Sequence, residues 1–256
     1  MTFDADLTAC AGIVERGDPD RFAAIMAAPV AARLRLFPIY AFNVEVARAP
    51  WVTAEAMIAE MRLQWWRDVL GEIAADGPVR RHEVATPLGK VLSPEMATRL
   101  EALVEARRWD IYRDPFEDMA AFRAHLEATS GLLLLAATQT LGEVDETPVL
   151  NAGYALGMAN WLRAVPALER AGRIPLVDGT PEAVRALATD GLAALKTARG
   201  APMPKPIRPA LTPLCQAQSL LRRAQSEPNA VAQDRLTLSP FLSRINLMRT
   251  AITGRW

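Results

Sequence analysis

Apolar residues recur along the chain at helical spacing, and Val and Ile do not form the alternating runs that half-buried strands show. Residues 30–49 are apolar around most of a helical circumference, which indicates a largely buried helix. Residues 53–74 carry one apolar flank that includes Trp65 and Trp66, and we expect this pair to pack in the core. The pattern therefore predicts an all-α protein.

Several predicted helices begin at a proline. A side chain that can cap a helix N-terminus precedes proline directly, and proline in the first helical turn loses nothing by lacking an N–H. The pairs are Asp18-Pro19, Ser93-Pro94, Asp114-Pro115, Thr147-Pro148, Thr180-Pro181 and Ser239-Pro240.

These starts, together with Gly and Pro breaks, predict the boundaries of about ten helices around a central cluster. We expect one domain over residues 1–256, with a stiff proline-rich connector, GAPMPKP, at 200–206. The predicted helices cover 4–15, 18–28, 30–49 with a kink at Pro38, 53–74, 87–92, 93–110, 117–141, 147–169, 181–198, 208–226 and 239–253.

Charge is balanced over the whole chain but not along it. The formal net charge is zero, so no nucleic-acid partner is indicated. Residues 199–256 hold nine Lys or Arg against two acids, Glu227 and Asp234, which gives +7 there and −7 in the rest. The simpler interpretation is a solvated helical face, and the alternative is peripheral contact with an anionic membrane or an acidic partner.

The two cysteines, Cys10 and Cys215, form no CxxC motif, so neither a disulfide framework nor a zinc site is indicated. The first residues lack the apolar region of a signal peptide. The longest uncharged stretches, 128–142 and 147–162, are shorter than the roughly 18 apolar residues that a spanning helix needs. We therefore expect a cytoplasmic protein, with peripheral contact at the inner membrane left open.

Motifs that occur in a characteristic order cover most of residues 20–180. The segments are FAAIMAAPVAARLRLFPIYAFN (22–43), LVEARRWDIYRDPFEDMAAF (103–122), HLEATSGLLL (125–134) and ALGMANWLRAVPALERAGRIPL (155–176). Together they resemble the squalene/phytoene synthase family. The resemblance implies a helical bundle with the isoprenoid (terpenoid) synthase-like fold.

The same resemblance places the family's two metal-binding DxxxD motifs on residues 47–51 and 164–168. Family synthases condense or rearrange isoprenyl diphosphates, and their aspartates bind Mg²⁺, which neutralises the leaving diphosphate. The Ala, Trp and Leu side chains at the four aspartate positions cannot bind Mg²⁺. The nearest carboxylates, Glu45 and Glu169, are out of register with these positions. We therefore expect no family-type catalytic residue and no metal. The four aspartate positions hold Ala47, Trp51, Ala164 and Leu168.

The motifs AFNVEVA (41–47), RLQWW (62–66) and LRA (162–164) resemble a divergent branch of the family. That branch also lacks the paired aspartates and includes a mitochondrial assembly factor of respiratory complex I. It implies a catalytically inactive scaffold or assembly factor whose client is a protein, such as a respiratory complex subunit. One alternative is an isoprenyl diphosphate-binding protein or atypical prenyl transferase, for which Mg²⁺ is expected. A generic helical interaction module is another.

We also expect that part of the family's diphosphate-binding cavity remains. Arginines can bind diphosphate oxygens, although arginines on helices also form ordinary ion pairs. The deciding observation is whether the space between the helices that carry Ala47 and Ala164 is open and polar, or is filled by Trp51 and Leu168. The candidate residues are Arg33, Tyr40, Asn43, Asp110, Arg163 and Arg173, with Arg35 as a further diphosphate partner.

Overall fold

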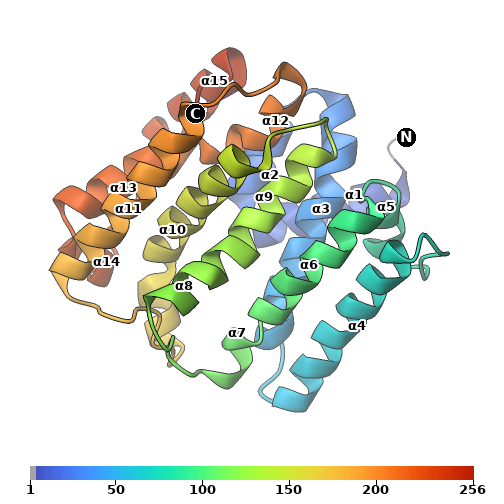
Figure 1. Cartoon of the computed structure of the whole chain (residues 1–256), viewed down its shortest axis with the longest axis horizontal. Helices are drawn as coiled ribbons and strands as arrows, with labels where there is room; N and C mark the ends of the chain where they lie inside the picture. Colours follow the sequence, from blue (N-terminus) through green and yellow to red (C-terminus); the bar gives the residue numbers. More distant parts are fainter. Residues whose placement is uncertain (1–3) are drawn as a thin grey trace.

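A computed structural model describes residues 4–256, and within this range every regular element is helical (Figure 1). This confirms the predicted all-α class. The longer helices are α1 (Ala5–Gly17), α2 (Pro19–Met26), α3 (Val30–Arg48), α4 (Ala56–Ala74), α6 (Pro94–Ala106), α8 (Met119–Leu126), α9 (Leu132–Gln139), α10 (Glu146–Arg170), α11 (Pro181–Arg199), α13 (Ala217–Ser226) and α15 (Pro240–Thr253).

Short helical turns connect these elements. They include a π-helical turn, η2, which joins α8 to α9. The short elements are η1 (Ala49–Trp51), α5 (Ala85–Gly89), α7 (Trp109–Tyr112), η2 (Glu127–Gly131), η3 (Lys205–Ile207), α12 (Arg208–Leu211), η4 (Thr212–Gln216) and α14 (Asn229–Ala232).

The long helices run side by side, with α11 and α13 at one edge of the bundle and α4 at the other (Figure 1). The longest helix, α10, contacts α9, η2, α11 and α13. One apolar cluster extends from α1 to the segment after α14 and includes Trp66, as expected from the sequence. Among residues 4–256, no helix combines the length and the apolar character that crossing a bilayer requires.

Four of the proposed helix starts are confirmed by their capping hydrogen bonds, and two are wrong. Asp18, Ser93, Thr180 and Ser239 cap α2, α6, α11 and α15. At the other two pairs, a nearby aspartate caps the helix instead. Asp118 Oδ1 accepts the amide of Ala121 at 2.7 Å, so α8 starts after the Asp114-Pro115 pair, and Asp145 Oδ1 accepts the amide of Thr147 at 3.2 Å.

Three predicted helices are also interrupted. Residues 208–226 form α12, η4 and α13, where Pro213 in η4 has no N–H to continue an α-helical ladder. Residues 117–141 divide at η2, and residues 93–110 end α6 at Ala106 before the short α7. In contrast, α3 runs through Pro38 as one continuous helix whose bounds lie close to the predicted 30–49.

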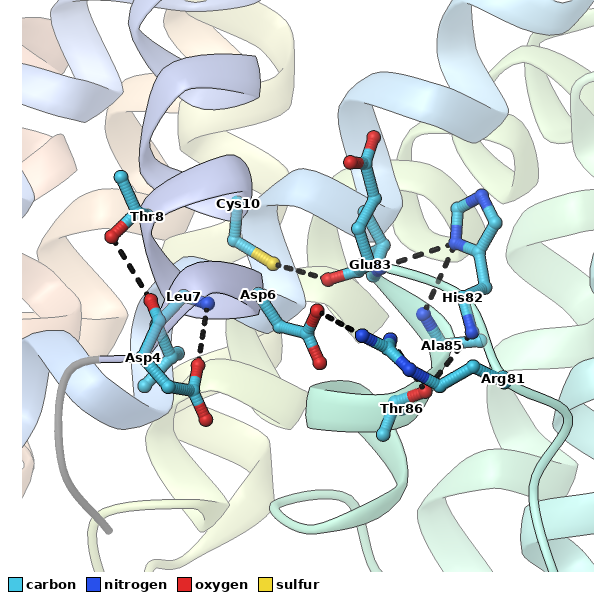
Figure 2. A network of polar contacts seen from close by, with 11 residues as sticks. Asp4, Asp6, Leu7, Thr8, Cys10, Arg81, His82, Glu83, Ala85 and Thr86 are labelled. Carbon is cyan, nitrogen blue, oxygen red and sulfur yellow. Dashed lines mark hydrogen bonds and ion pairs between the residues drawn. The ribbon is translucent and has the colours of Figure 1, made fainter.

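The N-terminal helix is fastened to the loop before α5 by a polar network (Figure 2). Arg81 Nη2 donates to Asp6 Oδ1 at 2.8 Å, and Cys10 Sγ donates to the carbonyl oxygen of Glu83 at 3.4 Å. Burial raises the pKa of the Cys10 thiol to about 12, so it remains a protonated donor at neutral pH. Within the loop, His82 Nδ1 accepts the amide of Val84 at 3.1 Å. These contacts hold α1 against the helices that form the core.

The backbones of α10 and η2 approach each other closely. A Cβ atom at Gly153 would lie 2.7 Å from Gly131 Cα and 2.9 Å from the carbonyl oxygen of Ser130. A Cβ atom at Gly157, one turn further along α10, would lie 2.8 Å from Ser130 Cβ. Glycine on α10 therefore allows the π-helical turn to pack directly on the helix backbone.

We predict that Gly153→Ala lowers the free energy of unfolding by about 1–2 kcal/mol, because overpacking against backbone outweighs the gain in helix propensity. Gly71→Ala is the matched control. Gly71 also lies inside a long helix, but an added Cβ there meets no atom within 4 Å. This control should gain about 0.5–1 kcal/mol. Denaturant unfolding measures both, and equal stabilities would contradict the close approach.

Candidate functional site

A cavity of about 590 Å³ lies between the C-terminal half of α3, the C-terminal half of α10, the start of α2 and η4. It is lined by all four residues that occupy the expected aspartate positions: Ala47, Trp51, Ala164 and Leu168. Ala47 lies on α3, Trp51 on η1, and Ala164 and Leu168 on α10, so the fold brings segments far apart in the sequence to one space. Trp51 and Leu168 line this space without filling it, because a cavity of that volume remains between them and the other lining residues. The cavity is thus retained.

Each carboxylate in the cavity wall is paired with an arginine that also lines the cavity. The wall therefore has equal numbers of acidic and basic side chains, and its charges compensate each other. The shortest N–O distances are 2.9 Å for Arg21 with Asp18, 2.8 Å for Arg163 with Asp20 and 3.7 Å for Arg107 with Asp110.

The Arg107–Asp110 pair is the most deeply buried of the three. Burial raises the pKa of Asp110, and the positive charges of Arg107 and Arg173 oppose that rise. Burial also lowers the pKa of Arg107, while Asp110 opposes that change. At 3.7 Å the pair is an ion pair rather than a close hydrogen bond, and Asp110 Oδ2 and Arg107 Nε have no hydrogen-bond partner among residues 4–256. This interaction explains Asp110 as a structural ion-pair member.

The donor set does not fit the Mg²⁺ ions implied by the family resemblance. Mg²⁺ requires several oxygen ligands in near-octahedral geometry. Each cavity carboxylate already faces an arginine, and residues 4–256 contain no cluster of three or more His, Cys, Asp or Glu side chains suited to a metal. Glu45 instead pairs with Arg48 at 3.3 Å, and neither Glu45 nor Glu169 lines the cavity.

Arg173 acts beside the cavity as a cross-link between segments. It follows Gly172, whose φ of 75° turns the chain at the end of α10. Its guanidinium donates to the backbone carbonyl oxygens of Asp110 and Ala171 and lies 4.7 Å from the ring centroid of Trp51. Arg173 is buried in these contacts and is not part of the cavity wall.

The other predicted residues divide into two groups. Asn43, Asp110 and Arg163 line the cavity, whereas Arg33 and Tyr40 do not. Arg33 Nε donates to the carbonyl oxygen of Ala28 at 2.7 Å. Tyr40 is buried in the core beneath the guanidinium of Arg21, 4.9 Å from the ring centroid. Arg33 and Tyr40 therefore lie outside the lining of this cavity.

Arg35 also points elsewhere. Its Nη1 donates to the carbonyl oxygen of Thr140 at 2.9 Å, which joins α3 to the end of α9, and it does not line the cavity. Two arginines of the cavity wall were not among the predicted residues. They are Arg21, on α2, and Arg107, directly after α6. The spacing of Arg21 three residues after Asp18 was the available signal, because residues three apart on a helix can pair.

Aromatic side chains pack behind one wall of the cavity. Trp161 lines the cavity, and its Nε1 donates to the carbonyl oxygen of Pro175 at 2.9 Å. His125 lies among these rings, 5.1 Å from Trp161 between ring centroids. Burial lowers the pKa of His125 to about 3, so the imidazole is neutral at physiological pH. The cluster consists of Trp109, Phe116, Phe122, His125 and Trp161.

Comparison with known proteins gives one family and one group of relatives. The family described as squalene/phytoene synthase matches residues 14–178. Human NADH dehydrogenase (ubiquinone) complex I, assembly factor 6 is 26% identical over 162 residues, which cover 61% of this chain and 48% of the relative. The Drosophila melanogaster homolog is 30% identical over 174 residues, 63% of this chain and 51% of the relative. The chain thus spans about half the length of these curated relatives.

Two solved synthase structures are similar to this chain in fold. A dehydrosqualene synthase in complex with ligand superposes with a TM-score of 0.79 at 14% identity, covering 95% of this chain and 94% of that one. A squalene synthase from Alicyclobacillus acidocaldarius gives 0.72 at 15% identity, covering 88% and 94%. At these identities the similarity concerns the fold, and it confirms the expected isoprenoid synthase-like bundle.

We predict that Asp110→Asn lowers the free energy of unfolding by about 1–3 kcal/mol, because it leaves the Arg107 charge without its partner beside the core. Asp20→Asn is the matched control. It removes the same charge from the same cavity, but the Asp20–Arg163 pair is substantially exposed. Its cost should be about 1 kcal/mol or less. Thermal and denaturant unfolding measure both, and equal effects would show that Asp110 carries no special electrostatic role.

Proposed function

This chain belongs to the squalene/phytoene synthase family, and we propose that it serves as a non-catalytic assembly factor for a respiratory membrane complex. The observation that carries the proposal is the cavity wall. The fold and the cavity of a synthase remain, while the four positions expected to hold metal-binding aspartates are Ala47, Trp51, Ala164 and Leu168. Such a protein offers a stable helical surface without the means to ionise an allylic diphosphate.

The electrostatics of the cavity support a non-catalytic role. Ionisation of a diphosphate ester requires concentrated positive charge at the leaving group, which metal ions or unpaired cations supply. Here Arg21, Arg107 and Arg163 are each held by a carboxylate. A diphosphate that entered the cavity would have to displace these carboxylates before it could gain the same cations.

The relatives support the assembly role. Several are named as complex I assembly factor 6, and their matched segments cover about three fifths of this chain. A respiratory complex subunit is the proposed client. The site of action is the face of the membrane that holds the complex, with peripheral contact through the basic C-terminal third.

Isoprenyl diphosphate binding is the alternative, and one observation favours it. The cavity retains polar atoms that have no hydrogen-bond partner among residues 4–256, including Asn43 Oδ1 and Ser130 Oγ in its wall. Against it stand the ion-paired arginines and the loss of the metal positions. Thermal-shift titration with farnesyl diphosphate, with and without Mg²⁺, separates the two, because only a binding protein gains stability from the ligand.

We predict that the purified protein forms no squalene, phytoene or other prenyl product from farnesyl or geranylgeranyl diphosphate, with or without Mg²⁺. The physical reason is that no residue can hold the cation at the diphosphate. Product analysis by mass spectrometry measures this, with an active family synthase as the positive control. Mg²⁺-dependent product formation would overturn the non-catalytic assignment.

We also predict that deleting the gene lowers the amount of assembled respiratory complex I in its host, measured by native gel electrophoresis and NADH oxidation in membranes. Wild-type protein should restore the complex. Ala164→Leu, which adds apolar volume to the cavity wall, should restore it equally if the cavity holds no required ligand. An undiminished complex after deletion would contradict the assembly role, and failure of a folded Ala164→Leu variant alone would favour the ligand-binding alternative.

A further inference from the structure

The last helix, α15, packs on the bundle with its polar side inward. Thr250 is buried, and its Oγ1 donates to the carbonyl oxygen of Arg255 at 3.0 Å. Asn246 Nδ2 donates to Ser219 Oγ of α13 at 3.5 Å. The helix contacts η4 and lies at the periphery of the bundle beside the C-terminus (Figure 1). This is the reverse of an ordinary surface helix, which buries its apolar stripe.

The apolar side of α15 consequently faces outward. Phe241, Ile245, Met248 and Ile252 are 71%, 42%, 61% and 79% exposed. Their spacing of four, three and four residues places them along one line on a helix with 3.6 residues per turn. Leu242 is also exposed. An apolar stripe along the whole of a surface helix marks an interaction site rather than scattered surface residues.

Arginines flank this stripe on both sides. At 100° per residue, Arg244 and Arg249 fall on opposite edges of the line formed by Phe241 and Ile252. Both arginines are exposed, and neither side chain has an ion pair or a hydrogen bond within residues 4–256. Residues 235–256 contain no Asp or Glu. The stripe is therefore bordered by unpaired positive charge only.

Further cations lie next to the helix. Lys205 and Arg208 line a shallow pocket that Ile252 also lines. Arg199, Arg249 and Arg255 line a second pocket beside the helix. The surface around α15 is thus basic well beyond the helix itself.

We propose that α15 docks flat on an anionic lipid bilayer, with Phe241, Ile245, Met248 and Ile252 in the headgroup–acyl boundary and the flanking arginines on lipid phosphates. An exposed apolar stripe with cationic edges is the pattern of helices that lie in the membrane interface. Peripheral contact also agrees with the finding that no helix among residues 4–256 is suited to cross a bilayer.

A second copy of this chain is a poorer occupant of the same surface. Symmetric pairing through α15 would bring Arg244 and Arg249 close to their equivalents, and the helix offers no carboxylate to pair with them. An anionic bilayer compensates these charges over its entire surface. The electrostatic complementarity therefore favours lipid.

This inference rests on the membrane contact proposed above but not on the assembly role. Purified protein and lipid vesicles test it without any client, so its failure would leave the complex I experiment unaffected. Loss of the assembly role would likewise leave vesicle binding intact.

The experiment is flotation of the purified protein with vesicles of phosphatidylcholine alone or of phosphatidylcholine mixed with phosphatidylglycerol. We expect binding to the anionic vesicles only, and weaker binding as NaCl is raised. The double variant Arg244→Gln/Arg249→Gln should bind about 30-fold more weakly, since each arginine near an anionic surface contributes about a factor of five. The double variant Met248→Glu/Ile252→Glu should lose binding.

Met57→Glu/Met61→Glu on α4 is the matched control. Met57 and Met61 are 75% and 66% exposed and also lie four residues apart, but their helix carries Glu60 beside them. This variant has the same added charge and should bind anionic vesicles like the wild type. Equal binding to neutral vesicles, no binding to either, or equal loss in the α4 and α15 variants would overturn the proposal. A dimer that the α15 variants dissociate, without vesicle binding, would overturn it in favour of a second copy.

Discussion

The close approach of α10 to the π-helical turn η2 is the constraint on which the cavity depends. Gly153 lets the backbone of Ser130 and Gly131 pack directly on α10, and Gly157 makes room for the Ser130 side chain. That contact fixes the lateral position of the longest helix, whose C-terminal half then forms one wall of the cavity. The opposite wall comes from α3, which is buried over most of its length. The cavity is a consequence of how these backbones pack, and it does not require the aspartates of a synthase.

The same packing explains how the cavity can form without the aspartates that the family resemblance implies. An unpaired arginine or carboxylate beside the core costs free energy, so the charges in the cavity wall need partners. Here each cavity carboxylate has an arginine, and Arg173 donates to backbone carbonyl oxygens beneath Trp51. The wall is neutralised by protein groups where a synthase would use metal and substrate. This arrangement stabilises the fold without any ligand.

Apolar periodicity between clear breaks predicted the long helices well. Residues 30–49, 53–74, 147–169 and 181–198 correspond to α3, α4, α10 and α11 within a few residues. The errors have local causes: Asp118 and Asp145 compete with the expected caps, and Pro213 interrupts a helix whose apolar spacing is otherwise continuous. The family register located Ala47 and Ala164 at the cavity, because a shared fold keeps equivalent helix positions facing the same space. It did not place Arg33 or Tyr40, because side-chain direction depends on tertiary packing.

The orientation of α15 shows what periodicity alone leaves open. A stripe with a period near 3.6 has one apolar and one polar side, but the pattern does not say which side meets the bundle. Asn246 bonds Ser219 of α13 and Thr250 is buried, so the apolar side is left outward with Arg244 and Arg249 at its edges. The excess positive charge of residues 199–256 then has a defined place in the fold, at the border of an exposed apolar surface. Exposed apolar side chains and unpaired arginines on one surface together indicate a partner that covers the first and neutralises the second. A solvated helical face would account for the positive charge alone.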